Sequence, residues 1–398
     1  MNAFEKIINL SQNEKEEKGL VHTPREIFQQ PEIWKKVAGL LKNNRNEIKD
    51  FMEHAGLYGK NESTVILTGA GSSEYIGNSI CNHLRKMLKR EVISIPTTHF
   101  VTHAGSTLVK GHKYTLISFA RSGDSPESLA TYDIIRKLFP DVKHIVITCN
   151  KNGALAKKAL KNKDLLPIIL PDESNDRSLV MTSSFTGMAF AGAGLGYIDS
   201  PDEFSRNAGL LVDAAKRIFE NYGDVIKEIA DIPFKRACYL GSNTLFGSMQ
   251  ECHLKLQEMT EGKVAARYDS FLGLRHGPKV FVNNESVVIA ALSSESYPKK
   301  YELDLLKELK ESTQALATLV ICSKKTPEIE KVSTHSIELF PEGSPVDDGL
   351  RFMTDTIIGQ ILGLFKSLYF GLKPDNPSTS GTINRVVKGV VIYDLPGK

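Results

Sequence analysis

Short apolar runs alternate along the chain with longer stretches that have helical patterning. The apolar runs are Val65–Thr68, Val92–Pro96, Tyr114–Phe119 and His144–Cys149 in the first half, and Ala237–Leu240, Val287–Leu292, Ala317–Cys322 and His335–Leu339 in the second. Runs of this length predict buried strands, and the stretches between them predict helices. Their alternation favours a parallel sheet covered by helices on both faces, so we predict an α/β fold.

The second half repeats the pattern of the first. Aligning TVILTGAGSSEYIGNSI with RACYLGSNTLFGSMQEC places Gly69 opposite Gly241, and aligning HIVITCN with ATLVICS places Thr148 near Cys322. A chain of 398 residues also exceeds what one hydrophobic core usually serves. We therefore predict one fold that occurs twice. The predicted division is a helical segment at 1–45, a first domain at 46–205 and a second domain at 206–398, with Pro201 marking a break before a helix.

Composition narrows the class of protein. With 41% hydrophobic and 24% charged residues the chain is typical of globular proteins, and no segment is long and apolar enough to span a bilayer. The first 18 residues lack the apolar core of a secretory signal, so a cytoplasmic location is expected. The net charge of +3 is scattered along the sequence, which argues against nucleic acid as a partner. Five separated cysteines without zinc-type spacing predict reduced thiols, and we expect no metal or cofactor.

Two loops that follow predicted strands are rich in hydroxyls. GAGSSEYIG opens a helix with Ser72 and Ser73, where backbone N–H groups and hydroxyls can bind a phosphate. SFARSGDSPESL repeats the arrangement with Arg121, Ser122, Ser125 and Ser128. In a doubly wound sheet such loops lie at the same carboxyl edge, where a monophosphate can collect hydroxyls, N–H groups and one guanidinium. The alternative is structural: a tight turn in the first loop, and a capping motif with Pro at the first helical position in the second.

A predicted helix, QECHLKLQEMTEG, brings three charged residues together. Glu251, Lys255 and Glu258 are spaced by four and three residues, so they share one face. The alternative is an exposed helix face with salt bridges. Further along, RYDSFLGLRHGPKVFV places His276 in a short His-Gly-Pro turn, a position that suits proton exchange better than core packing.

These motifs resemble those of a known family. Most of the chain is similar to tandem SIS (sugar isomerase) proteins, which are related to the isomerase half of glucosamine-6-phosphate synthase. RYDSFLGLRHGP, VMTSSFT and STSGTINRVVKGV are most similar to the AgaS group, described as tagatose-6-phosphate ketose/aldose isomerases or galactosamine-6-phosphate deaminase/isomerases. The resemblance implies two tandem SIS domains, each a doubly wound, mostly parallel sheet of the Rossmann-like or flavodoxin-like type.

The resemblance also implies roles for individual residues. The phosphate cradle would comprise Ser73, Arg121, Ser122 and Ser125, although the synthase has a serine at Ala120 and a glutamine at Arg121. Glu258 would move a proton between adjacent carbons, with Lys255 and Glu251 as neighbours. His276 would open the sugar ring and come from the adjoining subunit, which implies a homodimer or a larger assembly with shared active sites. Lys388 falls where the synthase has a functional lysine.

The implied substrate is a small phosphorylated sugar. The reaction would convert galactosamine 6-phosphate to tagatose 6-phosphate and ammonia through an enolamine or enediol intermediate. The alternatives are isomerisation of tagatose 6-phosphate without deamination, a deglycase that acts on sugar-amine adducts, and a sugar-phosphate sensor without catalysis. SIS-domain sensors usually lack the catalytic carboxylate, whereas Glu258 and His276 are both present in this chain.

Overall fold

The computed structural model describes residues 1–58, 62–159, 162–312, 315–343, 346–387 and 389–395. They form two compact units, each built around one sheet. The first-sheet unit comprises Ile33–Asn175, Ser183–Arg206 and Ile383–Lys398, and the second-sheet unit comprises Met1–Glu32, Asp176–Thr182 and Asn207–Thr382. The sequence-based domain boundaries follow the order of the chain instead, and they stay a prediction. Among the described helices, none is long and apolar enough to cross a membrane.

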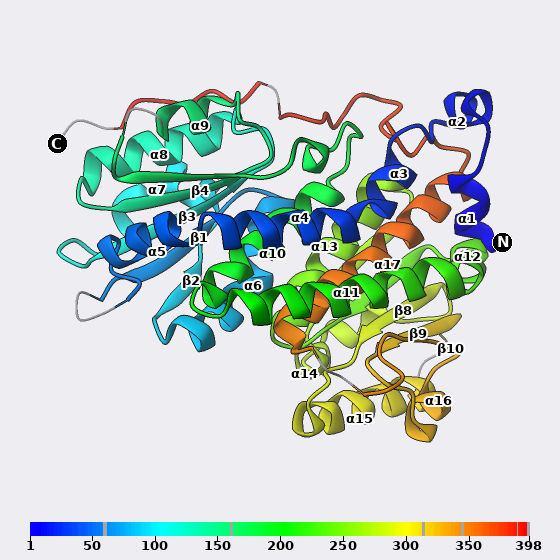
Figure 1. Cartoon of the computed structure of the whole chain (residues 1–398). Coiled ribbons are helices and arrows are strands. Elements are labelled where there is room, and N and C mark those ends of the chain that lie inside the picture. The colour runs from blue at the N-terminus through cyan, green and yellow to red at the C-terminus, as the bar shows by residue number, and fades with distance from the viewer. Residues whose placement is uncertain (59–61, 160–161, 313–314, 344–345, 388, 396–398) are drawn as a thin grey trace. The chain divides into compact units, whose positions relative to one another are not determined.

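The first sheet has five parallel strands in the order β2-β1-β3-β4-β5. The strands are β1 (Thr64–Thr68), β2 (Val92–Ser94), β3 (Tyr114–Ala120), β4 (Lys143–Thr148) and β5 (Leu165–Ile169). One face packs against α7 (Thr97–Thr107), α8 (Pro126–Leu138) and α9 (Ala154–Ala159), and the other against α6 (Ser72–Leu88) and α10 (Ser183–Gly194) (Figure 1). Helix α5 (Arg45–His54) also belongs to this unit, while α4 (Gln30–Asn43) and α11 (Pro201–Asn221) contribute residues to both units. The central strand β3 is buried along its whole length, as expected for a parallel sheet covered on both faces.

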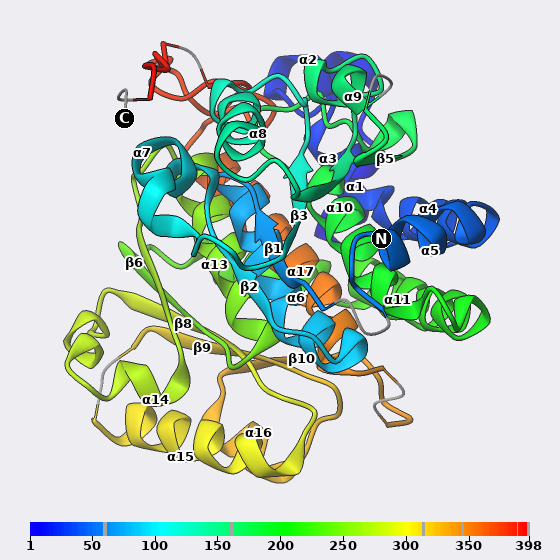
Figure 2. The same ribbon diagram turned by 90° about the vertical axis from the view of Figure 1, so that its left-hand side faces the viewer.

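The second sheet also has five parallel strands, in the order β10-β9-β8-β6-β7. The strands are β6 (Arg236–Leu240), β7 (Ala265–Asp269), β8 (Ser286–Ala291), β9 (Ala317–Cys322) and β10 (His335–Glu338). Helices α14 (Phe271–Leu274), α15 (Ser296–Ser312) and α16 (Pro327–Val332) cover one face, and α13 (Thr244–Met259) with α17 (Asp348–Tyr369) lies on the other (Figure 2). Helices α1 (Ala3–Ile8), α2 (Gln12–Lys18), α3 (Thr23–Phe28) and α12 (Gly223–Asp231) complete this unit.

The two sheets have the same topology, which confirms the prediction of one fold that occurs twice. Read from its other edge, the second sheet has the order β7-β6-β8-β9-β10, which matches β2-β1-β3-β4-β5 strand for strand. A side chain at Gly69 or at Gly241 would collide with the backbone of the helix that follows, at 2.5 and 2.4 Å. Two residues further on, Gly71 (φ 58°, ψ −128°) and Asn243 (φ 54°, ψ −123°) share one unusual conformation. The aligned glycines therefore perform the same turn.

The eight predicted strands are confirmed, with ends that shift by one or two residues. Strands β5 and β7 were not predicted. Strand β5 contains Pro167, and β7 has the half-exposed sequence AARYD, so neither reads as a buried apolar run. Both lie at sheet edges, where proline and polar residues are tolerated because one side of the strand makes no ladder.

Candidate active site

Two serine-rich loops lie side by side at the carboxyl edge of the first sheet. They are residues 69–73, which lead from β1 into the first turn of α6, and residues 121–125, between β3 and α8. The loops are neighbours because β1 and β3 are adjacent parallel strands, with Thr68 paired to Ser118 near their ends. Each loop leads into a helix, so the positive ends of two helix dipoles are brought to one edge of the sheet. The predicted convergence of the two loops is confirmed.

The serines of these loops combine capping with available polar groups. Ser72 and Ser73 are buried at the start of α6, and the Ser73 hydroxyl makes no hydrogen bond to the described residues. Ser122 Oγ accepts a backbone hydrogen bond within its own loop. Ser125 caps α8, since its Oγ accepts from the Ser128 amide at 3.3 Å and donates to Ser128 Oγ at 2.7 Å. The capping interpretation of residues 125–128 is thus confirmed, and it leaves a ligand role open because a cap sits at the anion-binding end of its helix.

Arg121 is the buried cation of this edge, with 8% of its surface exposed. Its Nη2 donates to the backbone carbonyl of Arg385, in the C-terminal segment of the first-sheet unit. Arg385 in turn donates from Nη2 to Asn175 Oδ1 at 2.7 Å. Arg385 was not predicted as a site residue, because 264 positions separate it from Arg121. The available signal was the motif STSGTINRVVKGV, which contains it.

The corresponding edge of the second sheet is occupied by carboxylates of the same chain. Ser293 and Ser294 follow β8, at the place where Arg121 and Ser122 follow β3. Asp348 accepts from Ser293 Oγ at 2.7 Å and from the Ser294 amide at 2.9 Å, and Glu302 accepts from the Ser293 amide at 2.8 Å. Donors that could bind an anion are therefore already used there, whereas at the edge of the first sheet the Ser73 hydroxyl makes no hydrogen bond to the described residues.

The three charged residues predicted on one helix face form a cluster on α13. Lys255 Nζ lies 3.3 Å from Glu251 Oε1 and also contacts Glu258 Oε2. Glu251 and Lys255 are almost completely buried, with side-chain exposures of 0% and 1%, whereas the Glu258 side chain is 24% exposed. The alternative of an exposed salt-bridged face is therefore wrong. Burial by itself lowers the pKa of Lys255, but the two carboxylates outweigh it and the pKa is raised, so Lys255 stays protonated.

Close helix packing explains why this cluster is buried. Helix α13 crosses α17 at two glycines, where a side chain would not fit: a Cβ at Gly359 would lie 2.4 Å from Cys252 Sγ, and a Cβ at Gly363 would lie 2.7 Å from Met259 Sδ. Small residues at such crossings let two helices approach closely and exclude water. One end of the cluster is thereby sealed, and Glu258 is the member that solvent or a ligand can reach.

His276 lies in the turn between α14 and a short 3-10 helix (Pro278–Phe281), as predicted. Gly277 has φ 111°, a conformation that favours glycine, so the His-Gly-Pro sequence itself produces the turn. The imidazole is exposed and makes no hydrogen bond within the described residues. The structure does not bring His276 into contact with Glu258. Lys388 lies outside the described residues.

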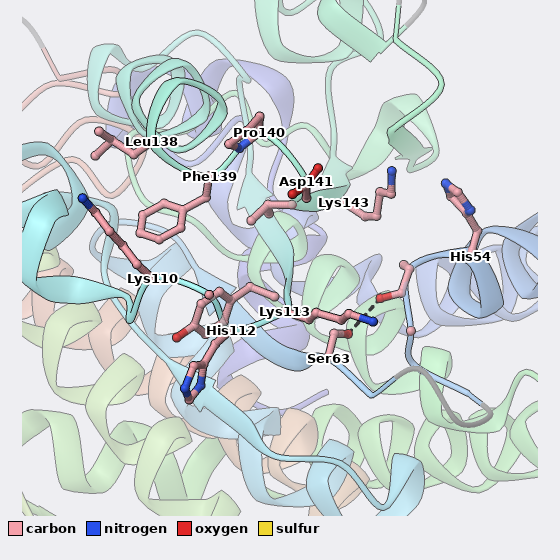
Figure 3. Close-up of a pocket in the computed structure, with 15 residues that line it drawn as sticks. His54, Ser63, Lys110, His112, Lys113, Leu138, Phe139, Pro140, Asp141 and Lys143 are labelled. Carbon is pink, nitrogen blue, oxygen red and sulfur yellow. Dashed lines mark hydrogen bonds between the residues drawn. The ribbon is translucent and has the colours of Figure 1, made fainter.

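A separate cavity of about 590 Å³ opens at the amino edge of the first sheet, opposite the serine-rich loops. It lies at the C-terminal ends of α5 and α8 and is lined by basic residues, among them His54, Lys110, Lys113 and Lys143. Figure 3 shows the three lysines pointing in different directions, with Lys143 near His54. Lys143 and His54 both contact Asp164, at 2.6 and 3.7 Å, which accounts for these two side chains without a ligand. Across the described residues, no group of three or more His, Cys, Asp or Glu side chains is placed to hold a metal ion.

Comparison with known proteins shows the family. D-galactosamine-6-phosphate deaminase AgaS of Escherichia coli is 36% identical to the chain over 373 residues, which cover 93% of this chain and 95% of that protein. Among solved structures, tagatose-6-phosphate ketose/aldose isomerase from Escherichia coli superposes with a TM-score of 0.85 at 33% identity, over 94% of this chain and 97% of the other. The C-terminal domain of glucosamine-fructose-6-phosphate aminotransferase from Francisella tularensis shares the fold, with a TM-score of 0.73 at 17% identity, over 92% of this chain and all of the other. No protein-family model matches the chain.

The duplicated parallel sheet, with serine-rich loops at its carboxyl edge, defines a tandem SIS-domain protein. Within that class, the chain belongs to the AgaS family.

Proposed function

We propose that the chain is a sugar-phosphate isomerase-deaminase that converts galactosamine 6-phosphate and water to tagatose 6-phosphate and ammonia. The observation that carries the proposal is Glu258, a carboxylate that remains accessible while a buried ammonium, Lys255, holds it in place. A positioned carboxylate of this kind suits general acid-base catalysis. The relatives support the substrate, since one is named a galactosamine-6-phosphate deaminase and is 36% identical to the chain.

The proposed role of the serine-rich loops is to bind the phosphate group. Arg121 supplies a permanent cation, Ser73 supplies a hydroxyl, and the positive ends of the α6 and α8 dipoles favour an anion. Binding energy from the phosphate, which does not react, then serves to fix the sugar carbons in a reactive position.

The proposed role of the α13 cluster is to move a proton. His276 transfers a proton from the anomeric hydroxyl to the ring oxygen, and the ring opens to a carbonyl at carbon 1. Glu258 then removes the proton from carbon 2, whose electron pair forms the enolamine, and delivers a proton to carbon 1. The product is a ketimine at carbon 2, which water hydrolyses to the ketone and ammonia. Lys255 stabilises the negative charge that develops on oxygen.

Isomerisation without deamination is the second candidate. The same proton transfers on a substrate with a hydroxyl at carbon 2 interconvert an aldose and a ketose. A solved structure at 33% identity, named a tagatose-6-phosphate ketose/aldose isomerase, favours it.

The decisive test is a screen of galactosamine, glucosamine and tagatose 6-phosphates for ammonia release and for isomerisation. Glu258→Gln should lower the rate by about 10²- to 10⁴-fold and stop exchange of the carbon-2 proton with solvent deuterium. Glu285→Gln is the matched control, because Glu285 is also a partly exposed carboxylate paired with a lysine, at 2.5 Å, in the same unit. Undiminished exchange in Glu258→Gln would exclude Glu258 as the base.

We further propose that the active form is at least a dimer, in which His276 serves the site of the partner. The exposed position of His276 on a glycine turn supports this role. If the site is shared, mixing Glu258→Gln with His276→Ala after subunit exchange should regenerate about a quarter of wild-type activity, because each mixed dimer contains one intact site. A mixture that stays inactive although mixed dimers form would contradict the shared site.

A further inference from the structure

The turn that carries His276 is fixed at both ends by the core of the second-sheet unit. Phe271 and Leu274 of α14 precede the turn and Val282 follows it, and all three are buried in one hydrophobic cluster with three leucines of α15. Figure 2 shows α14 and α15 side by side. Between these anchors, Arg275 and His276 are exposed. Burial therefore fixes where the turn begins and ends, and it leaves the position of the imidazole to other contacts.

A carboxylate of α15 contacts the turn on both sides of His276. Glu308 Oε2 lies 3.1 Å from Arg275 Nη2, and Glu308 Oε1 accepts a hydrogen bond from Lys279 Nζ. Each carboxylate oxygen thus contacts one of the two cations. Among the described residues, the side-chain ion pairs and hydrogen bonds of positions 275–280 all end on Glu308.

We propose that Glu308 is a positioning residue, which holds the His-Gly-Pro turn so that the His276 imidazole reaches the sugar ring; this rests on the proposed function. Gly277 has φ 111°, and a glycine has access to more backbone conformations than any other residue, so the turn can change shape most easily at this point. Arg275 precedes that glycine and Lys279 follows it. A carboxylate that binds both side chains therefore limits the movement of the residues between them.

The alternative is an ordinary surface ion pair. The side chains of Arg275 and Glu308 are each 35% exposed and that of Lys279 is 34% exposed, so solvent weakens both attractions and their contribution to global stability should be small. The contribution to geometry is different, because a displacement of about 1 Å can lower a rate by about 10²-fold. The hydrogen bond from Lys279 lowers the pKa of Glu308, so the carboxylate stays charged at neutral pH.

The test compares turnover of galactosamine 6-phosphate with proton exchange in an analogue that cannot cyclise. A 4,5-dideoxy analogue has no hydroxyl that can close a five- or six-membered ring, so it does not need His276 for ring opening. We expect Glu308→Gln to lower kcat for galactosamine 6-phosphate about tenfold with KM unchanged, and to leave carbon-2 proton exchange in the analogue at the wild-type rate. Glu311→Gln is the matched control, because Glu311 is an exposed carboxylate of the same helix and makes no ion pair with the described residues.

Reversing the three charges tests whether the ion pairs act through the turn. The triple variant Arg275→Glu/Lys279→Glu/Glu308→Arg restores opposite charges at the same places, so it should recover most of the lost kcat. The double variant Arg275→Glu/Lys279→Glu places three carboxylates together and should be at least as slow as Glu308→Gln. A triple variant as slow as the double variant would overturn the positioning role, and so would an equal loss in Glu308→Gln on the cyclic substrate and on the analogue.

His276→Ala separates this inference from the proposed function. A low kcat in His276→Ala beside wild-type turnover in Glu308→Gln would overturn the role of Glu308 and leave that of His276 standing. Wild-type turnover in His276→Ala would overturn both. If the wild type turns over none of the three sugar phosphates, the proposed reaction is wrong, and amide hydrogen exchange of residues 271–282 then tests Glu308 alone. Faster exchange in Glu308→Gln than in Glu311→Gln would keep its positioning role, and equal exchange would remove it.

Discussion

Replacing Lys255 by methionine should destabilise the second-sheet unit severely. Glu251 has 0% side-chain exposure and lies 3.3 Å from the Lys255 ammonium, so Lys255→Met leaves a carboxylate in a dry site without this cation. Glu258 suffers less, because its side chain is 24% exposed and water can hydrate it. Removing one partner of a buried ion pair typically costs about 3–5 kcal/mol, and we expect a loss of this size in the free energy of unfolding.

The assay is urea unfolding followed by circular dichroism at neutral pH. The double variant Glu251→Gln/Lys255→Met carries no buried charge at these positions and should recover most of the stability. Recovered stability without recovered activity would separate the structural role of the pair from its role beside Glu258. A loss below about 1 kcal/mol, typical of an exposed pair, would refute the reasoning.

Two further predictions concern other buried contacts of the second-sheet unit. Gly359→Ala should cost about 1–3 kcal/mol in thermal unfolding, because its Cβ would lie 2.4 Å from Cys252 Sγ and 2.7 Å from Cys252 Cβ. Cys252→Ala removes only the sulfur, so it should relieve part of the loss and leave the rest. Gly209→Ala is the neutral control, because no atom lies within 4 Å of its Cβ. Burial and the charge of Asp176 raise the pKa of Glu26 to about 7, so the native state holds a proton that the unfolded state releases. The free energy of unfolding should therefore fall as pH rises from about 4.5 to 7, and Glu26→Gln should remove that slope; an unchanged slope would show that Glu26 is not its source.

The sequence predicted the fold well where burial is uniform. Runs such as Tyr114–Phe119 and Ala317–Cys322 are apolar because both faces of a central parallel strand are covered, so their composition alone identifies them. Strands β5 and β7 were not predicted because an edge strand tolerates residues that a central strand does not. Pro167 in β5 and the charged Arg267 and Asp269 in β7 are compatible with pairing on one side only.

The candidate site was predictable where it depends on local spacing. Three charges at positions 251, 255 and 258 must share a helix face, and they do. Spacing could not decide whether that face is buried, because the answer depends on the glycines of α17, about 100 residues further along the chain. For the same reason the contact of Arg121 with Arg385 could not be predicted, since it joins two loops that only the folded unit brings together.

The duplicated fold explains why the two halves can have different chemistry. Both sheets turn their first loop with the same backbone conformation, at Gly71 and at Asn243, so both present donors at the carboxyl edge. In the second half, Asp348 and Glu302 accept hydrogen bonds from Ser293 and Ser294, in the loop after β8, which corresponds to the loop of Arg121 and Ser122 in the first half. A carboxylate of the chain itself is always present, whereas a phosphate must diffuse in. Asp348, the first residue of α17, therefore links the edge of the second sheet permanently to the helix that packs against α13. The loops of the first half stay the proposed binding site for the phosphate group.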